Sequence, residues 1–370
     1  MPPKCVKYGR SRKMTRMSET GFDYRKNALD VIKYWAAFCV MYLHYTGYAR
    51  SHVSGAGSVF MSMLRSVVNF FPPVVIFITV SGFLVSASYE RTGSRRDFFR
   101  KRFLRLFPPL WICTAVNLAV VTFICGIRPD RSVIPWLVTQ LVGFANTPAY
   151  LKSFATGSVN GALWTVFVLL QLYVLLAFVY PYLKKLNIRG WLVILGTGAA
   201  VNILCYAVQL ALPEGHAVLR LLERSLFPYA VWFLTGSFLY MKRDTVQVKL
   251  LRSPAAAAGI VILMIVMRIF TLPDPGYYAG IITASLCSAA SIAAGYLLPP
   301  VRIRPDITYE MFLYHWIVLN VIVHFELMDR LHWALCFILY TLVTLAVSFA
   351  AWRFDTAVQE RLKRSVIKNR

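Results

Sequence analysis

The stretch LDVIKYWAAFCVMYLHY, from Leu29 to Tyr45, decides how this chain folds, because it is apolar enough to cross a bilayer and yet carries a lysine and a histidine. Lys33 and His44 are eleven residues apart. That spacing returns them to nearly the same helix face, roughly 16 Å apart along the axis. Ionisable groups in a membrane span usually face a bundle interior or a watery cavity, so we expect a functional site here.

A second interpretation of this helix is open. Lys33 could extend to the cytoplasmic interface while His44 lies at the outer headgroup level, and this stretch alone favours neither interpretation.

The composition of the chain is that of a polytopic membrane protein. Of its 370 residues, 58% are hydrophobic and 15% are charged, and the mean hydropathy is +0.58, which excludes an ordinary soluble globular protein. We expect an all-α bundle of about ten transmembrane helices, because ten apolar stretches are each near the length needed to cross. The predicted spans are residues 29–50, 67–89, 107–126, 162–182, 191–212, 226–241, 254–272, 278–299, 308–325 and 333–352.

The positive charge lies mostly between these spans. A net charge of +24 would suggest nucleic acid as the partner of a soluble protein. Here 30 of the 40 lysines and arginines fall on one side of the membrane if the amino terminus is cytoplasmic. This asymmetry predicts that both termini are cytoplasmic and that no nucleic acid is bound. We expect a disordered basic arm over residues 1–27, a transmembrane domain over 28–353 and a basic cytoplasmic tail over 354–370.

The seven cysteines show neither a pairing pattern nor metal-ligand spacing. We therefore expect no disulfide framework, no metal site and no tightly bound cofactor. Cys5 should be exposed on the cytoplasmic arm, and the other six lie in apolar spans, where a thiol behaves as a small hydrophobe. These six are Cys39, Cys113, Cys125, Cys205, Cys287 and Cys336.

The densest charge run is RTGSRRDFFRKRFLRLFPPLW, which holds seven basic residues from Arg91 to Arg105. It is a topological anchor that also attracts anionic lipid. Arg102 and Arg105, three residues apart, share one helix face and could in addition grip phosphate groups.

Three further short motifs contain polar residues in apolar surroundings. They are SGFL with Ser81, NGALW with Trp164 and, a little further on, Gln171, and DITYEMFLYH with Glu310 and His315. Helix packing explains Ser81 and Gly82 at least as well as chemistry does, because small residues let helices approach closely. A packed, hydrogen-bonded side chain is an equally good interpretation of His315.

In this order, the motifs resemble membrane acyltransferase family 3, the integral-membrane O-acyltransferases that modify surface polysaccharides and related acceptors. The resemblance covers roughly residues 28–352. Two positions depart from the family. It usually has arginine where this chain has Lys33, which keeps the charge but loses the bidentate fork, and it commonly has a glutamate where this chain has Leu169 and Leu170. The matching residues are Leu29, Asp30, Lys33, Ala36, His44, Phe77, Ser81, Gly82, Phe83, Leu84, Arg102, Arg105, Pro108, Asn160, Gly161, Leu163, Trp164, Gln171, Tyr173, Ile307, Tyr309, Glu310, Leu313 and His315.

The resemblance implies an acyl-CoA-dependent O-acyltransferase in a bacterial cytoplasmic membrane, acting on the cell envelope. It would move an acyl group, most often acetyl, from cytoplasmic acyl-CoA to a hydroxyl of an extracytoplasmic carbohydrate or lipid-linked carbohydrate. We expect His44 to be the general base, because its ordinary pKa of about 6.5 suits that task. Lys33 would take part in catalysis and, with Arg102 and Arg105, hold the co-substrate acyl-CoA. Ser81, Trp164, Gln171, Glu310 and His315 are further candidates.

The main alternative is a transporter or flippase of lipid-linked saccharide, in which the intramembrane charges would form a pathway. The chain shows no internal repeat and no pair of matching broken helices, which speaks against it. A catalytically inactive relative that only binds lipid or partners is a third possibility. Consumption of acyl-CoA distinguishes the enzyme from both. The sequence does not identify the acceptor, the acyl chain or the oligomeric state.

Overall fold

The computed structural model describes residues 23–52, 59–245 and 253–368, and within these ranges all regular secondary structure is helical. The prediction of an all-α protein is confirmed for this part of the chain. The helices are α1 (Leu29–His52), α2 (Val59–Phe70), α3 (Pro73–Thr92), α4 (Arg95–Ala119), η1 (Val120–Ile124), α5 (Val133–Leu141), η2 (Ala149–Leu151), α6 (Trp164–Leu183), α7 (Ile188–Ala211), α8 (Ala217–Glu223), α9 (Ala230–Met241), α10 (Pro254–Ile269), α11 (Ile281–Leu297), α12 (Thr308–His324), α13 (Leu327–Arg330) and α14 (Trp333–Lys368).

Each of the ten predicted spans overlaps one of these helices. Five helical stretches are long and apolar enough to cross a membrane, and α9, α10 and α11 are shorter apolar helices. The fold is therefore that of a helical membrane protein, while the number of crossings and the side on which the termini lie stay predictions. The five stretches are Val59–Thr92, Arg95–Ile124, Trp164–Leu183, Ile188–Ala211 and Trp333–Arg361.

Helix α3 lies at the centre of the bundle and packs most closely on α9, with α1 and α11 on its other sides. The contact depends on two glycines. A Cβ on Gly82 would lie 2.0 Å from the carbonyl oxygen of Phe233, and a Cβ on Gly236 would lie 2.0 Å from that of Thr79. Among apolar helices in lipid, association depends on close van der Waals packing rather than on removal of water, so small residues mark the contact. The packing interpretation of Gly82 is thus confirmed.

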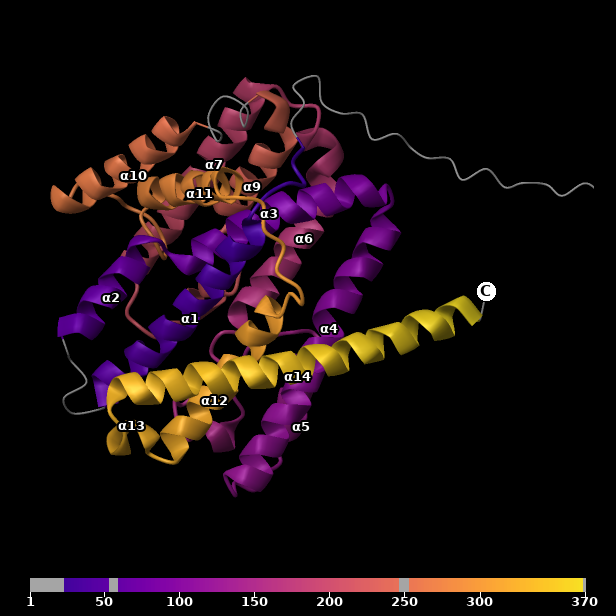
Figure 1. The fold of residues 1–370 in the computed structure, drawn as a ribbon, viewed down its shortest axis with the longest axis vertical. Coiled ribbons are helices and arrows are strands. Elements are labelled where there is room, and N and C mark those ends of the chain that lie inside the picture. The colour runs from indigo at the N-terminus through magenta and orange to yellow at the C-terminus, as the bar shows by residue number, and fades with distance from the viewer. Residues whose placement is uncertain (1–22, 53–58, 246–252, 369–370) are drawn as a thin grey trace, which may run out of the picture.

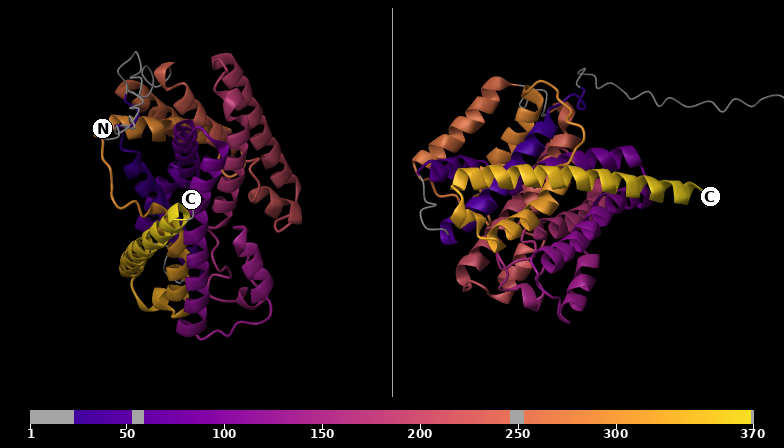
Figure 2. Two further views of the ribbon diagram at one scale, coloured as in Figure 1. Left: turned by 90° about the vertical axis from the view of Figure 1, so that its right-hand side faces the viewer. Right: turned by 60° about the horizontal axis from the view of Figure 1, so that its bottom comes forward.

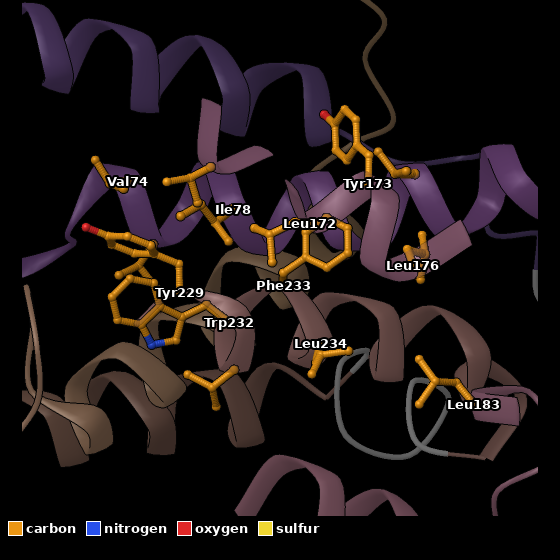
Figure 3. Packing of buried hydrophobic residues seen from close by; sticks show 14 of the residues in the cluster. Val74, Ile78, Leu172, Tyr173, Leu176, Leu183, Tyr229, Trp232, Phe233 and Leu234 are labelled. Carbon is orange, nitrogen blue, oxygen red and sulfur yellow. The ribbon is translucent and has the colours of Figure 1, made fainter. Parts of the chain in front are cut away.

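The largest buried cluster joins α3 and α9 to α6. Figure 3 shows Val74 and Ile78 of α3 close to the rings of Tyr229 and Phe233, with Trp232 beneath them. This cluster fixes the position of α3, which lines the candidate site.

Helix α1 runs through the bundle beside α3 and α12, and α14 packs across α12 and α4 (Figure 1). In the right-hand view of Figure 2 the C-terminal end of α14 extends beyond the other helices. The predicted tail over residues 354–370 therefore continues the last helix as far as Lys368. Most of the predicted arm, residues 1–22 with Cys5, lies outside the described residues.

Two prolines and a serine set the ends of the helices around the site. Pro72 and Pro73 separate α2 from α3, because a proline within a helix removes a hydrogen bond and clashes with the preceding turn. The hydroxyl of Ser94 accepts a hydrogen bond from the Asp97 N–H and caps α4. The charge run that includes Arg102 thus becomes the first three turns of α4.

Candidate active site

Two histidines from opposite ends of the sequence meet inside the bundle. The His44 Nδ1 of α1 lies 2.9 Å from the His315 Nε2 of α12. The rings are nearly parallel, with 8° between their planes and 5.1 Å between their centroids. His315 is completely buried, whereas His44 is partly accessible. The structure thus joins the predicted base to one of the other candidates, and only one of the two rings is open to a substrate.

The hydrogen bonds of this pair determine which nitrogen carries each proton. The His315 Nδ1 lies 3.1 Å from the carbonyl oxygen of Met311. A carbonyl can only accept, so Nδ1 carries the proton and the Nε2 of neutral His315 is an acceptor. His44 must then donate from Nδ1, which leaves its Nε2 unprotonated. No described residue bonds to that Nε2, so His44 presents a free lone pair, as a general base requires.

Trp316 packs against the His44 ring. The two rings meet edge to face, with centroids 4.6 Å apart. The indole N–H donates to the Thr156 hydroxyl and to the Ser158 carbonyl. A Cβ on Gly161 would lie 2.5 Å from the indole. The glycine of the NGALW motif is therefore required for the loop before α6 to fit against Trp316, a role that the sequence did not reveal.

A cavity of about 180 Å³ lies among α1, α3, α4, α6 and α12. At one end it is lined by Lys33, Arg102 and Arg105, and towards His44 it becomes apolar. Val40 and Phe312, which line its apolar part, stand one helical turn before His44 and His315 respectively. The cavity thus runs from a cluster of cations towards the histidine pair. We call it the inner cavity.

Lys33 lies between two carboxylates. Its Nζ is 2.9 Å from Asp30 and 2.6 Å from Asp306, in the connection between α11 and α12. Burial raises the pKa of the Asp306 carboxyl, but the charge of Lys33 and hydrogen bonds from Lys33 and Thr308 outweigh it, so that pKa lies below its usual range. Lys33 therefore ties α1 to the start of α12, and its charge is largely matched.

The two arginines of α4 differ in their surroundings. Arg102 donates to the Ser88 hydroxyl and lies over the rings of Phe98 and Tyr173. It forms no ion pair with any described residue, and its buried Nε has no hydrogen-bond partner. The Arg105 side chain is 55% exposed and lies 3.5 Å from Asp306. Arg102 thus offers an unmatched positive charge to the inner cavity.

The other candidates are dispersed. The Ser81 hydroxyl bonds to the Tyr173 hydroxyl at 2.9 Å, and both groups line the inner cavity. Gln171 bonds to the backbone of Arg224 and Leu226 and so holds the loop before α9. Trp164 packs on Tyr229. None of these contacts places Gln171 or Trp164 beside His44.

Glu310 forms no hydrogen bond with either histidine among the described residues. Its nearest charges are Arg105, Asp355 of α14 and Asp306, and its Oε2 is buried without a partner. Leu169, one of the two positions where the resemblance predicts a glutamate, lines the inner cavity and supplies no carboxylate. The group bonded to His44 in this chain is instead His315.

Sequence reasoning missed Asp306 and Trp316. The signal for Asp306 was Lys33 itself, because a lysine in an apolar helix needs a compensating acid, and DITYEM supplies one at its first position. Trp316 had no comparable signal, since an aromatic residue beside a motif is usually part of the core. Within the described part of the chain no three metal-ligating side chains gather.

Comparison with known proteins identifies the family of the chain. The profile of a family described as an acyltransferase domain matches residues 26–353. Nodulation protein 10 of Rhizobium leguminosarum bv. viciae is 23% identical over 369 residues, covering 93% of this chain and 96% of that protein. An O-acetyl transferase of Shigella phage Sf6 is 25% identical over 177 residues, which cover 46% of this chain and 50% of the phage protein. No solved structure matches the chain significantly.

Proposed function

The chain belongs to the acyltransferase family whose domain spans residues 26–353, and on that premise we propose that it is a membrane O-acyltransferase that moves an acyl group, acetyl by expectation, from acyl-CoA to a carbohydrate hydroxyl. The observation that carries the proposal is the His44–His315 pair, because it leaves the partly accessible His44 with a free lone pair on Nε2, one helical turn beyond Val40 of the cation-lined cavity. The relative named as an O-acetyl transferase supports acetyl as the group.

In this mechanism the acceptor hydroxyl gives its proton to the His44 Nε2 while its oxygen attacks the thioester carbonyl. A tetrahedral oxyanion forms, the C–S bond breaks, and the leaving thiolate takes the proton back from His44. Atoms and charge balance, so no cofactor or external proton is needed. His315 is a positioning residue, since it touches neither substrate and acts through His44.

The inner cavity is the proposed site of the donor. Arg102 and Arg105 would hold the phosphates of coenzyme A, because guanidinium groups bind phosphate oxygens with paired hydrogen bonds. The buried, unpartnered Nε of Arg102 supports this role. The apolar part of the cavity would take the flexible arm that ends in the thioester. Lys33, held by two carboxylates, would contribute mainly by fixing α1 beside α12.

The positive-inside pattern supports placing the Lys33 end of the bundle in the cytoplasm, where acyl-CoA is found. The acceptor would then approach from the opposite side. In this geometry the donor is never released across the membrane, because only its acyl group reaches His44.

The test is transfer of radiolabelled acetyl groups from acetyl-CoA to surface glycan in membranes that contain the protein. His44→Ala should lose transfer by about 10²- to 10⁴-fold, yet bind acetyl-CoA as wild type does. His324→Ala is the matched control, because within the described part of the chain the ring contacts of His324 are with Phe154 and Phe325, away from the histidine pair. Arg102→Ala should raise the KM for acetyl-CoA. Wild-type membranes that consume no acetyl-CoA would favour the transporter instead.

A further inference from the structure

A second cavity, of about 500 Å³, lies at the His44 end of the bundle. It is enclosed by the end of α1, the junction between α2 and α3, the end of α10 and the start of α11. Its volume is within the range of about 300–1,000 Å³ typical of small-molecule sites. We call it the outer cavity. None of the steps of the proposed transfer reaction described above involves this cavity.

Helices α1 and α3 each line both cavities, at neighbouring positions. On α3, Pro73 lines the outer cavity and the next residue, Val74, lines the inner one. On α1, Val40 lines the inner cavity and Leu43, one turn later, lines the outer one. His44 follows Leu43 directly. The predicted base therefore stands on the turn of α1 from which Leu43 lines the outer cavity.

Arg65 of α2 is hydrogen-bonded to the same turn of α1. Its Nη1 donates to the Leu43 carbonyl at 3.0 Å and to the Thr46 hydroxyl at 2.6 Å. The guanidinium thus clamps the turn of α1 that carries His44. Among the described residues Arg65 has no acidic partner, so an uncompensated cation stands beside the site where negative charge would develop.

The walls of the outer cavity combine hydrogen-bonding groups with an aromatic ring. Neither the Asn69 nor the Arg268 side chain has a hydrogen-bond or ion-pair partner among the described residues, so both are available to a ligand. Tyr278 is 46% exposed, and its ring also packs near Trp164 and Trp232. The backbone of Tyr278 has a φ of 69°, a left-handed conformation that a bulky residue adopts only when its surroundings hold it there.

The Asp274 carboxylate, unlike the Asn69 and Arg268 side chains, already has hydrogen-bond partners within the protein. Its two carboxylate oxygens accept the backbone N–H groups of Ile282 and Thr283 at the start of α11. A Cβ on Gly280 would collide with this carboxylate at 2.1 Å. Asp274 therefore shapes the cavity, while Arg268 and Asn69 are the groups that face a ligand.

We propose that the outer cavity is the acceptor site, and that it binds a sugar ring against Tyr278 with hydrogen bonds from Asn69 and Arg268. A half-exposed aromatic ring beside unpartnered donors suits a sugar, whose C–H face is apolar and whose hydroxyls accept hydrogen bonds. A hydroxyl of that ring would reach His44 past Leu43, the residue of α1 that lines this cavity. This inference rests on the proposed transfer reaction, and its test separates the two.

The experiment uses the full chain in lipid nanodiscs and a panel of short-chain alkyl glycosides: neutral hexosides, N-acetylhexosaminides and hexuronides. Binding of each probe is measured without donor, and acetyl transfer is measured with acetyl-CoA. Arg268→Ala and Asn69→Ala should each weaken binding and raise the KM for the bound glycoside by about tenfold. The KM for acetyl-CoA should not change. Arg330→Ala is the control, because this exposed arginine forms its ion pair among the described residues with Glu326 and lines neither cavity.

The outcomes are distinct. Glycoside binding that weakens in both variants supports the site, even if wild type transfers no acetyl group and the proposed reaction fails. Transfer by wild type with unchanged glycoside KM in both variants would overturn the site and leave the reaction standing. Absence of binding to every glycoside would overturn the assignment to a sugar.

Discussion

At the scale of single residues, this protein orients its proposed base with a second imidazole. The family commonly has a glutamate on the helix corresponding to α6, where Leu169 and Leu170 stand here. A neutral imidazole can still fix the tautomer of a second histidine, because its unprotonated nitrogen accepts a hydrogen bond from the N–H of that histidine. His315 does this for His44, and the Met311 carbonyl does it for His315.

This arrangement predicts that His315 can be replaced only by a residue whose side chain accepts a hydrogen bond from His44. His315→Phe should lower the turnover of acetyl transfer by roughly 10²-fold, the effect of losing orientation at a reacting group, without changing the KM for acetyl-CoA. His315→Gln should recover part of the loss, because its side-chain oxygen can accept from the His44 Nδ1. Turnover rates measured at saturating donor check this. Equal losses in both variants would indicate a purely structural role.

At the scale of helices, α1 and α3 organise both cavities. Each helix contributes to the inner cavity along its middle and to the outer cavity at its His44 end. Pro72 and Pro73 matter because they begin α3 beside the outer cavity, which both residues line. The position of α3 in turn depends on its contact with α9.

The α3–α9 contact should therefore be sensitive to one added methyl group. Gly82→Ala should lower the free energy of unfolding by about 1–3 kcal/mol, the usual cost of overpacking, because its Cβ meets the backbone of Phe233 rather than a flexible side chain. Gly259→Ala in α10 is the control, since nothing lies within 4 Å of the added Cβ. Thermal unfolding in detergent measures both. A melting temperature unchanged by Gly82→Ala would contradict the packing described here.

At the scale of the whole molecule, the cations of the inner cavity and the outer cavity lie at different levels of α1, with Lys33 near the start of the helix and Leu43 on the turn that carries His44. This arrangement suits a reaction between substrates from different compartments. It requires that the Lys33 end be cytoplasmic, as the distribution of lysine and arginine predicts.

Cysteine labelling tests that orientation. In a Cys5→Ser background, Lys185→Cys lies between α6 and α7, and Glu214→Cys lies beyond the far end of α7, both at exposed positions. In intact cells an impermeant maleimide should label Glu214→Cys at once and Lys185→Cys only after permeabilisation. The six described native cysteines are buried and should not react. The reverse pattern would invert the proposed sidedness.

Several features of this protein could be predicted from its sequence. Long apolar runs become helices because backbone groups in lipid must be satisfied within their own segment, so ten ranges could be assigned without a structure. Ordered motifs of charged and polar residues identified His44, Arg102 and Arg105 as candidates, because ionisable groups are rarely placed in apolar helices without a purpose.

The partners of those residues were decided only by the tertiary structure. His44 and His315 are 271 residues apart, and Lys33 and Asp306 are 273 apart. Spacing along one helix can place two residues on a face, but it does not determine which face of another helix will meet them. Helix packing settles that question, and with it the tautomer of His44, the pairing of Lys33 and the residues that line the two cavities.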